Sequence, residues 1–472
     1  MGMAQGLHKE RQTNGHGMTD MNARILIRQG LWLALSVCGS LVPAAGKAQS
    51  EGWTADACIR YAMEHSPRIR NRQLDARMAR ADKVAAYGDF LPSIQAVGTA
   101  GRQLGRSIDQ QTNQYTSEAF WESTMGLQVS LPLFEGFSRI HAVRFHKLNE
   151  EIHALSVRVE ENSLAFEVLE AFYRHCYDRE MLELATEQRK LGEQYCEQMR
   201  EYVDLGMRSL AYLQEVKAQL QADICQETAC SHDCRLSLLA LKELMHMADG
   251  DTLALAMTDE QVEMAADSLG VDQLCAISES VLPEFQAMGM REKAARKSLS
   301  MARGAFYPSV RMEFNLNTGY YDTEKDAWGG IVPFRVQMHR NRNKYVGVSV
   351  SLPLFAGLSR WSAGRKEKLR LQQVRNENEL QRSSLYKEIH TTCLAFLAAL
   401  QECRLAGEQL CAASLTWRES EEKWREGMVS PFELLEKRNR YVRAKAEVVR
   451  TKLQCALKKR LVRFYLDGTF LR

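Results

Sequence analysis

The placement of proline most constrains the fold of this chain. The interval from Leu133 to Leu282 contains no proline. An interior proline destabilises a helix by about 3 kcal/mol, so long helices persist only in such intervals. Within residues 138–204, apolar residues recur at steps of three and four, as on one face of a helix. These residues predict one helix, and residues 359–426 predict a second.

Both predicted helices are too long for an ordinary globular domain. A helix of roughly 67 residues extends about 100 Å at a rise of 1.5 Å per residue. Such a helix cannot bury its own apolar face, so it needs partner helices along its length. The sequence therefore predicts a coiled-coil assembly or a helical tube.

The chain is an internal duplication. The segment 129–139 (VSLPLFEGFSR) reappears at 350–360 as VSLPLFAGLSR, an offset of 221 residues. Two further pairs of segments match in the same order: Leu91-Pro92-Ser93-Ile94 with Tyr307-Pro308-Ser309-Val310, and Gly206-Met207-Arg208-Ser209 with Gly427-Met428-Val429-Ser430. The offset changes only between the two proline motifs, which indicates exposed loops of variable length there.

Each repeat carries two segments with the period-two alternation of a β-strand. We expect strands at about 93–102, 121–131, 309–319 and 344–352. The alternation is clearest in the third strand: Val310, Met312, Phe314 and Leu316 alternate with Arg311, Glu313, Asn315 and Asn317. Each strand therefore has one apolar and one polar face. The expected order in each repeat is helix, strand, loop, strand, long helix, turn and helix.

Aromatic residues collect at the ends of these strands. They are Phe90, Phe120, Trp121 and Phe134 in the first repeat and Phe306, Tyr307, Tyr320, Tyr321, Tyr345 and Phe355 in the second. Membrane barrels carry such aromatic girdles at the lipid interfaces, whereas a soluble sandwich is the alternative. Four strands cannot close a barrel, and an open edge in lipid leaves unpaired backbone groups at several kcal/mol each. A membrane location therefore requires oligomerisation.

The first residues, 1–48, have the pattern of a secretory signal peptide. Arg24 and Arg28 precede a short apolar run that is followed by small residues. Met21 is an alternative start, Cys38 is a candidate lipidation site, and a buried core segment is the alternative interpretation. No later run approaches the roughly 18–20 apolar residues of a membrane-spanning helix, so an exported chain of this kind can cross a membrane only with strands.

The mature chain then comprises two repeats, residues 49–250 and 251–472, without signs of an enzyme. The whole 472-residue chain has 62 basic and 59 acidic residues, and its net charge of +3 argues against nucleic acid as a partner. The twelve cysteines show no disulfide framework, and those near His232 lack zinc-site spacing. Phosphate-binding glycine loops, His-Glu-x-x-His and nucleophile elbows are missing from the sequence. We therefore expect no cofactor, no metal site and no catalysis.

Together these features resemble the TolC family of outer-membrane efflux channels over nearly the whole mature chain. The resemblance rests on two copies of Ser-Leu-Pro-Leu-Phe-x-Gly, two Pro-Ser strand starts and two Gly-Met turns. It implies a mainly α-helical fold with a β-barrel part. In a homotrimer, four strands per protomer complete a twelve-stranded barrel in outer-membrane lipid, and an α-helical coiled-coil tunnel continues it into the periplasm.

The resemblance also implies a passive exit duct of a tripartite efflux or type I secretion system. A periplasmic adaptor, the membrane fusion protein, would join the duct to an inner-membrane pump of the RND, ABC or MFS type. The alternative is a soluble periplasmic coiled-coil adaptor or scaffold. The apolar faces at both strand pairs favour the channel. Drugs, metals, bile salts, peptides and proteins all remain compatible as cargo.

The helix-helix turns are where this resemblance places the adaptor contacts. They align on Leu205, Gly206 and Met207 in the first repeat and on Gly427 and Met428 in the second. Glycine permits the backbone geometry that ends one helix, and the flanking apolar residues would contact an adaptor. An ordinary helix cap is the alternative. The residue before Gly427 is Glu, where the family usually has Val.

A narrow periplasmic aperture and a barrel-tunnel junction complete the implied sites. The aperture aligns on Glu433 and Glu436, which share a helix face, and Tyr212 and Glu215 occupy these positions in the first repeat. In a trimer, six carboxylates would surround one opening and attract cations, although two exposed glutamates without a role are the alternative. The junction aligns on Pro132, Phe134 and Gly136, and on Pro353, Phe355 and Gly357.

Overall fold

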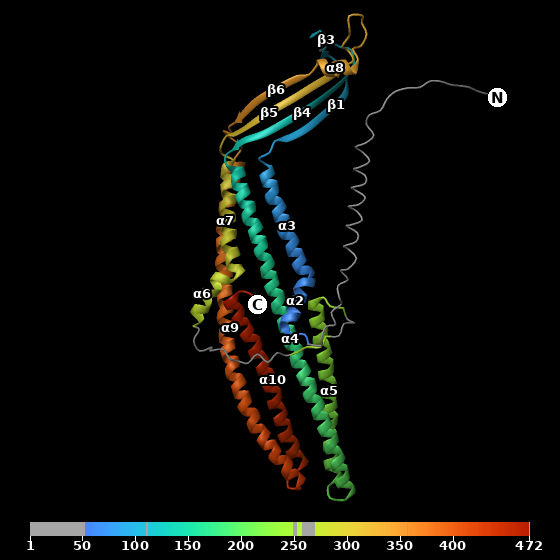
Figure 1. The fold of residues 1–472 in the computed structure, drawn as a ribbon, viewed down its shortest axis with the longest axis vertical. Helices are drawn as coiled ribbons and strands as arrows, with labels where there is room; N and C mark the ends of the chain where they lie inside the picture. The colour runs from blue at the N-terminus through green and yellow to red at the C-terminus, as the bar shows by residue number, and fades with distance from the viewer. Residues whose placement is uncertain (1–51, 110–111, 249–252, 257–269, 356, 472) are drawn as a thin grey trace, which may run out of the picture. The chain divides into compact units, whose positions relative to one another are not determined.

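The computed structural model describes residues 52–109, 112–248, 253–256, 270–355 and 357–471, and the expected signal peptide lies outside them. The first repeat contains α2 (Ala55–His65), α3 (Pro67–Gly88), β1 (Ser93–Gln103), β2 (Ser107–Ile108), β3 (Tyr115–Thr116), β4 (Phe120–Glu135), α4 (Ser138–Asp204) and α5 (Leu210–Met245). The second contains α6 (Val271–Val281), α7 (Pro283–Gly304), β5 (Ser309–Tyr321), α8 (Phe334–Arg340), β6 (Asn343–Ser351), α9 (Ser359–Arg425) and α10 (Pro431–Asp467). The long strands lie beyond one end of α4 and α9, and the α4–α5 and α9–α10 turns lie at the other (Figure 1).

The two longest helices occupy equivalent places in the two repeats. α4 and α9 each have 67 residues, as the proline-free interval and its repeat predicted. The shorter helices α3 and α7 begin at Pro67 and Pro283, where the missing N–H of proline costs nothing. Among the described residues, none of the helices is long and apolar enough to cross a membrane.

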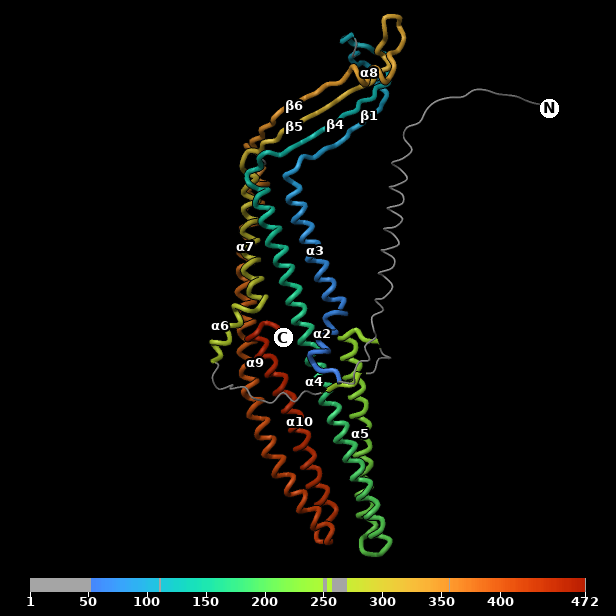
Figure 2. Tube along the Cα trace, in the orientation of Figure 1, coloured from blue at the N-terminus to red at the C-terminus, as the bar shows by residue number. Residues whose placement is uncertain are grey.

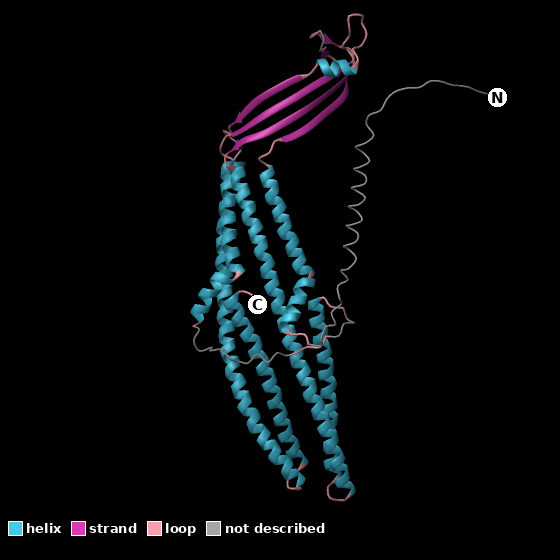
Figure 3. Ribbon diagram, in the orientation of Figure 1, coloured by secondary structure: helices cyan, strands magenta, loops and turns pink. Residues whose placement is uncertain are grey.

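The four long strands form one antiparallel sheet in the order β1-β4-β5-β6 (Figure 1). Figure 3 shows these strands in magenta, beyond the ends of the helices. Residues directly opposite each other on neighbouring strands point to the same face. One such row is Ile94, Val129, Phe314 and Val346, and the adjacent row is Gln95, Gln128, Asn315 and Tyr345. The sheet therefore has one apolar and one polar face, as the alternation predicted.

Strand β4 extends further than its alternation indicated. It runs to Glu135 rather than to residue 131, and its register with β5 shifts between Pro132 and Phe134. Proline cannot donate to a ladder and is tolerated at bulges, so this bulge carries the strand past Pro132. The short elements β2, β3 and α8 lie in the segments that the sequence marked only as loops.

The strand-to-helix junctions share one backbone turn but differ in packing. Gly136 and Gly357 both have left-handed backbones, with φ of 58° and 56°. A Cβ at Gly136 would lie 2.1 Å from the carbonyl oxygen of Gly304, whereas nothing lies within 4 Å of one at Gly357. Phe134 packs edge-to-face on Phe137 with ring centroids 5.1 Å apart.

In the second repeat the junction is more open within one protomer. Pro353 follows the end of β6, and Phe355 is 83% exposed. The first junction is therefore packed within the protomer, while the second presents its motif to the surroundings.

The largest buried cluster joins helices from both repeats. Leu169 and Phe172 of α4 belong to one cluster with Ile389 and Phe396 of α9, and residues of α2, α3, α5, α6 and α10 lie in it as well. Burial raises the pKa of the Cys58 thiol to about 12, so this cysteine stays protonated. The described cysteines are unpaired, and most of them pack as small apolar side chains.

A buried ion pair joins the two helix hairpins, α4–α5 and α9–α10. Arg438 of α10 donates to both carboxylate oxygens of Asp223 on α5, at 2.7 and 2.9 Å, and the two side chains are 1% and 9% exposed. Gln219 donates to the same carboxylate at 2.9 Å. A Cβ at Gly192 of α4 would lie 2.9 Å from Asp223 Oδ2, so glycine leaves room for the pair.

Replacing Asp223 with alanine should lower the free energy of unfolding by about 3–5 kcal/mol, because it leaves the buried Arg438 without its counter-charge. The measurement is the thermal midpoint followed by helical circular dichroism in detergent. The double variant Asp223→Leu/Arg438→Met should recover most of this loss. The control Glu408→Ala breaks an exposed pair with Arg404 and should cost less than about 1 kcal/mol. Equal losses in Asp223→Ala and the control would contradict this assignment.

Gly136→Ala should destabilise the protein more than Gly105→Ala. Both changes place a side chain on a backbone with positive φ, at about 1–3 kcal/mol. Only at Gly136 does the new methyl group also meet the carbonyl oxygen of Gly304. The same thermal midpoint should therefore fall further for Gly136→Ala, and equal shifts would show that the close approach is not significant.

Candidate functional site

The two turns predicted to contact an adaptor share one geometry. Gly206 and Gly427 have φ of 70° and 76° and end α4 and α9. Met207 N–H donates to Tyr202 O at 2.8 Å, and Met428 N–H donates to Lys423 O at 2.9 Å. These bonds form the helix-ending motif in which a glycine takes the left-handed position. The predicted glycines are therefore backbone determinants of both turns.

Apolar side chains project from both turns. Leu205, Met207 and Met428 are 72%, 67% and 69% exposed. These exposed side chains are the ones that the resemblance assigns to adaptor contact. We call the group Leu205, Gly206, Met207, Gly427 and Met428 the tip surface. Figure 2 shows both turns at the end of the helices opposite the sheet.

The two turns are held together by Arg208, whose role no local sequence pattern indicates. Arg208 Nη2 donates to Gly427 O at 3.1 Å, and its guanidinium lies 5.6 Å from the centre of the Trp424 ring. Arg208 lies inside the Gly-Met turn that matches between the repeats, but the residue that it contacts is 219 residues away in the sequence. The tip surface is therefore one structure shared by both repeats.

An apolar cluster beneath the tip surface fixes the four helix ends. Tyr195 and Met199 of α4, Leu213 of α5, Trp424 of α9 and Leu434 of α10 are buried together. Burial raises the pKa of the Tyr195 phenol, and the nearby Glu421 carboxylate adds to this rise. The phenol therefore stays neutral and behaves as part of the cluster.

The glutamates predicted to form the aperture lie at the start of α10. Glu433 N–H donates to the side chain of the N-cap Ser430 at 3.2 Å. Glu436 lies one helical turn further on, and both glutamates are exposed, whereas Leu434 is buried. Helix α10 therefore presents both carboxylates on a face that does not pack within the protomer.

Basic side chains accompany these carboxylates. The Glu436 carboxylate lies 3.9 Å from the Arg440 guanidinium. Glu215 and Glu436 also line one hollow between α5 and α10, together with Arg440 and Arg443. The structure therefore brings Glu215, the first-repeat counterpart, close to Glu436, and it adds two arginines that the resemblance did not imply.

Lys423 lies at the end of α9, across the turn from Glu433. Its ammonium donates to Glu419 at 2.7 Å, and this bond raises the pKa of Lys423, with a smaller contribution from Glu433. Glu433 therefore also has a cation near it.

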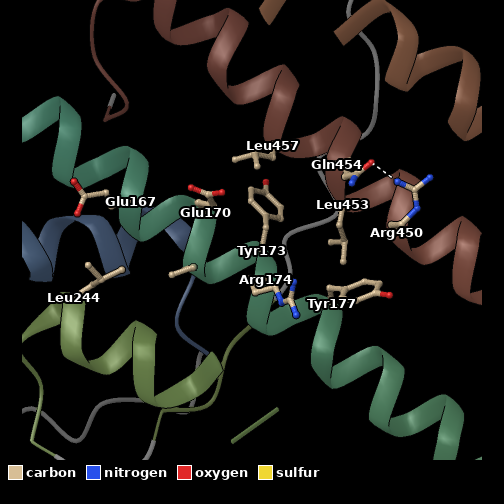
Figure 4. Close-up of a pocket in the computed structure, with 11 residues that line it drawn as sticks. Glu167, Glu170, Tyr173, Arg174, Tyr177, Leu244, Arg450, Leu453, Gln454 and Leu457 are labelled. Carbon is tan, nitrogen blue, oxygen red and sulfur yellow. Dashed lines mark hydrogen bonds between the residues drawn. The ribbon is translucent and has the colours of Figure 1, made fainter. Parts of the chain in front are cut away.

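A separate hollow of about 750 Å³ lies between α4 and α10 (Figure 4). Tyr173 and Tyr177 line it on one side and Leu453 and Leu457 on the other. Tyr177 is about 40 Å from the α4–α5 turn at 1.5 Å per residue, so this hollow is not part of the tip surface or the aperture. Among the described residues, His, Cys, Asp and Glu form no group of three or more able to hold a metal ion.

Comparison with known proteins places this geometry in a family. The model of the family "Outer membrane efflux protein" matches residues 58–245 and 280–465, one match in each repeat. The chain is similar to the solved structure of CusC, with a TM-score of 0.75 and 14% identity over 90% of this chain and 95% of that one. It is similar to VceC from Vibrio cholerae, with a TM-score of 0.74 and 13% identity over 88% and 96%.

A third similar structure is the open state of the MtrE outer membrane channel from Neisseria gonorrhoeae, with a TM-score of 0.68 and 18% identity over 89% of each chain. No curated protein sequence matches the chain. At these identities the structures show the fold, and the family model shows the family.

The two halves of the family match coincide with the two repeats, and the four-stranded sheet with its apolar face is the part that enters the membrane. Proteins of this family form trimeric channels with a helical extension into the periplasm. The alternative interpretation, a soluble periplasmic coiled-coil adaptor or scaffold, is not supported. The chain belongs to the outer membrane efflux protein family and is an outer-membrane efflux channel rather than an enzyme.

Proposed function

We propose that this channel is the exit duct of a tripartite assembly, in which a periplasmic adaptor joins it to an inner-membrane pump of the RND, ABC or MFS type. The observation that carries this proposal is the tip surface, where two matching turns expose Leu205, Met207 and Met428. Apolar side chains so exposed favour a protein partner. In this role the duct is passive, and the energy for export would come from the pump. Export by a type I secretion system would use the same duct.

We propose the tip surface as the adaptor site because its backbone is fixed before a partner binds. The bonds at Gly206 and Gly427, together with the Arg208 bridge, hold both turns in one arrangement. Preorganised contacts lose less conformational entropy on binding. The open space around a Cβ at Gly206 also leaves room for close approach of a partner helix.

We propose Glu433 and Glu436 as the aperture because they face away from the packed interior of the protomer. Three copies would bring six carboxylates around one axis, which favours cations and disfavours anions. Arg440 offsets part of the charge of Glu436. The buried pair of Arg438 and Asp223 anchors this segment of α10 on α5, so it supports the position of both carboxylates.

Replacing both Glu433 and Glu436 with alanine should raise single-channel conductance in planar bilayers and weaken block by multivalent cations. Smaller side chains widen the opening, and loss of the carboxylates removes the cation-attracting field. The control Glu408→Ala removes an exposed carboxylate elsewhere on α9 and should leave both properties unchanged. Unchanged conductance and block in the double variant would remove the aperture assignment.

A photo-reactive amino acid in place of Met207 or Met428 should cross-link the adaptor in intact cells, because both side chains are exposed on the tip surface. The control position is Leu415, which is 61% exposed on α9 but lies away from the turns. Mass spectrometry of the captured protein would identify the pump system. Capture from position 415 alone would contradict the tip surface as the adaptor site.

A further inference from the structure

The apolar face of the sheet ends in two cations at the end away from the helices. Arg102 of β1 lies directly opposite Trp121 of β4, in the same facial series as Gly98 opposite Met125. Lys344 of β6 lies directly opposite Leu316 of β5, which in turn lies opposite Leu127. Since opposite residues share a face, both cations stand on the apolar, lipid-facing side.

Both cations are exposed and have no ion-pair partner among the described residues. The nearby Arg340 differs, because it pairs with the buried carboxylate of Glu324. Asp322 lies beside Trp121, and its carboxylate accepts from Trp121 N–H at 2.8 Å. Arg102 and Lys344 are therefore available to an anion from outside the protein.

The two cations lie on β1 and β6, the two edge strands of the four-stranded sheet (Figure 1). Arg102 is the second-last residue of β1, and Lys344 is the second residue of β6, so each is one residue from the outer end of its strand. In a closed antiparallel barrel, β6 of one copy pairs with β1 of the next. Each subunit junction therefore brings Lys344 of one copy and Arg102 of its neighbour onto adjacent strands.

We propose that these junctions bind the phosphate groups of an anionic glycolipid in the outer leaflet. Arginine presents a planar fork that matches phosphate geometry, and lysine adds a compact charge beside it. Their long aliphatic stems cross the apolar face while the charged ends reach the headgroup layer. The exposed Trp121 ring beside Arg102 has the amphipathic character typical of a membrane interface. The proposal rests on the outer-membrane barrel of the family and not on the tip surface or aperture.

The test titrates the purified trimer in a non-ionic detergent with lipid A that carries two phosphates, and with the same lipid after removal of both phosphates. Native mass spectrometry counts the bound lipids. The wild type should bind the phosphorylated lipid more tightly than the dephosphorylated one. The variant Arg102→Gln/Lys344→Gln should lose roughly fivefold in affinity for each cation removed, and only toward the phosphorylated lipid.

Two matched variants separate charge from structure. Arg102→Lys keeps the charge and should retain most of the preference for phosphorylated lipid. Lys368→Gln/Arg370→Gln removes two exposed cations from α9 and should leave binding unchanged. The proposal fails if the wild type does not distinguish the two lipids, or if the α9 variant loses as much affinity. It also fails if inorganic phosphate displaces the lipid at equal concentration, since the site would then be one for a free anion.

Discussion

The unpaired backbone at the two edges of the sheet determines how this protein assembles. Among the described strands, β1 pairs only with β4 and β6 pairs only with β5, so each leaves a row of N–H and C=O groups open. In hydrocarbon, each unpaired group costs several kcal/mol. An even number of antiparallel strands lets β6 of one copy pair with β1 of the next while the apolar faces continue around the ring. In the trimeric channel of the family, each copy of the chain pairs both of its edge strands with neighbouring copies.

The helices follow from this closure. Because β4 and β6 each lead within a few residues into α4 and α9, a ring of strands imposes a ring of helices beneath it. At both junctions two consecutive residues, Gly136-Phe137 and Gly357-Leu358, adopt left-handed backbones and redirect the chain from strand to helix. The duplicated motif therefore encodes the junction. The long helices then extend from the ring of strands to the tip surface.

Local periodicity explains which parts of this fold could be predicted from sequence. Steps of three and four marked α4, and period-two alternation marked the strands and the identity of each face. The continuation of β4 past Pro132 depends on a bulge against β5, which no local pattern encodes. Helix α8 depends on Gln337, whose side chain bonds both backbone groups of Tyr321 from 16 residues away. The pair of Asp223 and Arg438 joins residues that each read as ordinary surface charges on their own helices.

The two strand-to-helix junctions differ in packing, and this difference indicates which contact a neighbouring copy would make. Gly304 ends α7 and lies against Gly136. At the offset that relates Pro92 to Pro308, the counterpart of Gly304 in the first repeat is Gly88, which ends α3. Helix α7 packs on both α4 and α9, whereas α3 packs on α4. The contact equivalent to the one between Gly304 and Gly136 would therefore join the Gly88 end of α3 in one copy to Gly357 of another copy. Nothing lies within 4 Å of a Cβ at Gly88 or Gly357 in one protomer. Both glycines keep the small size that such an approach requires, so we infer that the repeat contact inside a protomer recurs between protomers around the ring.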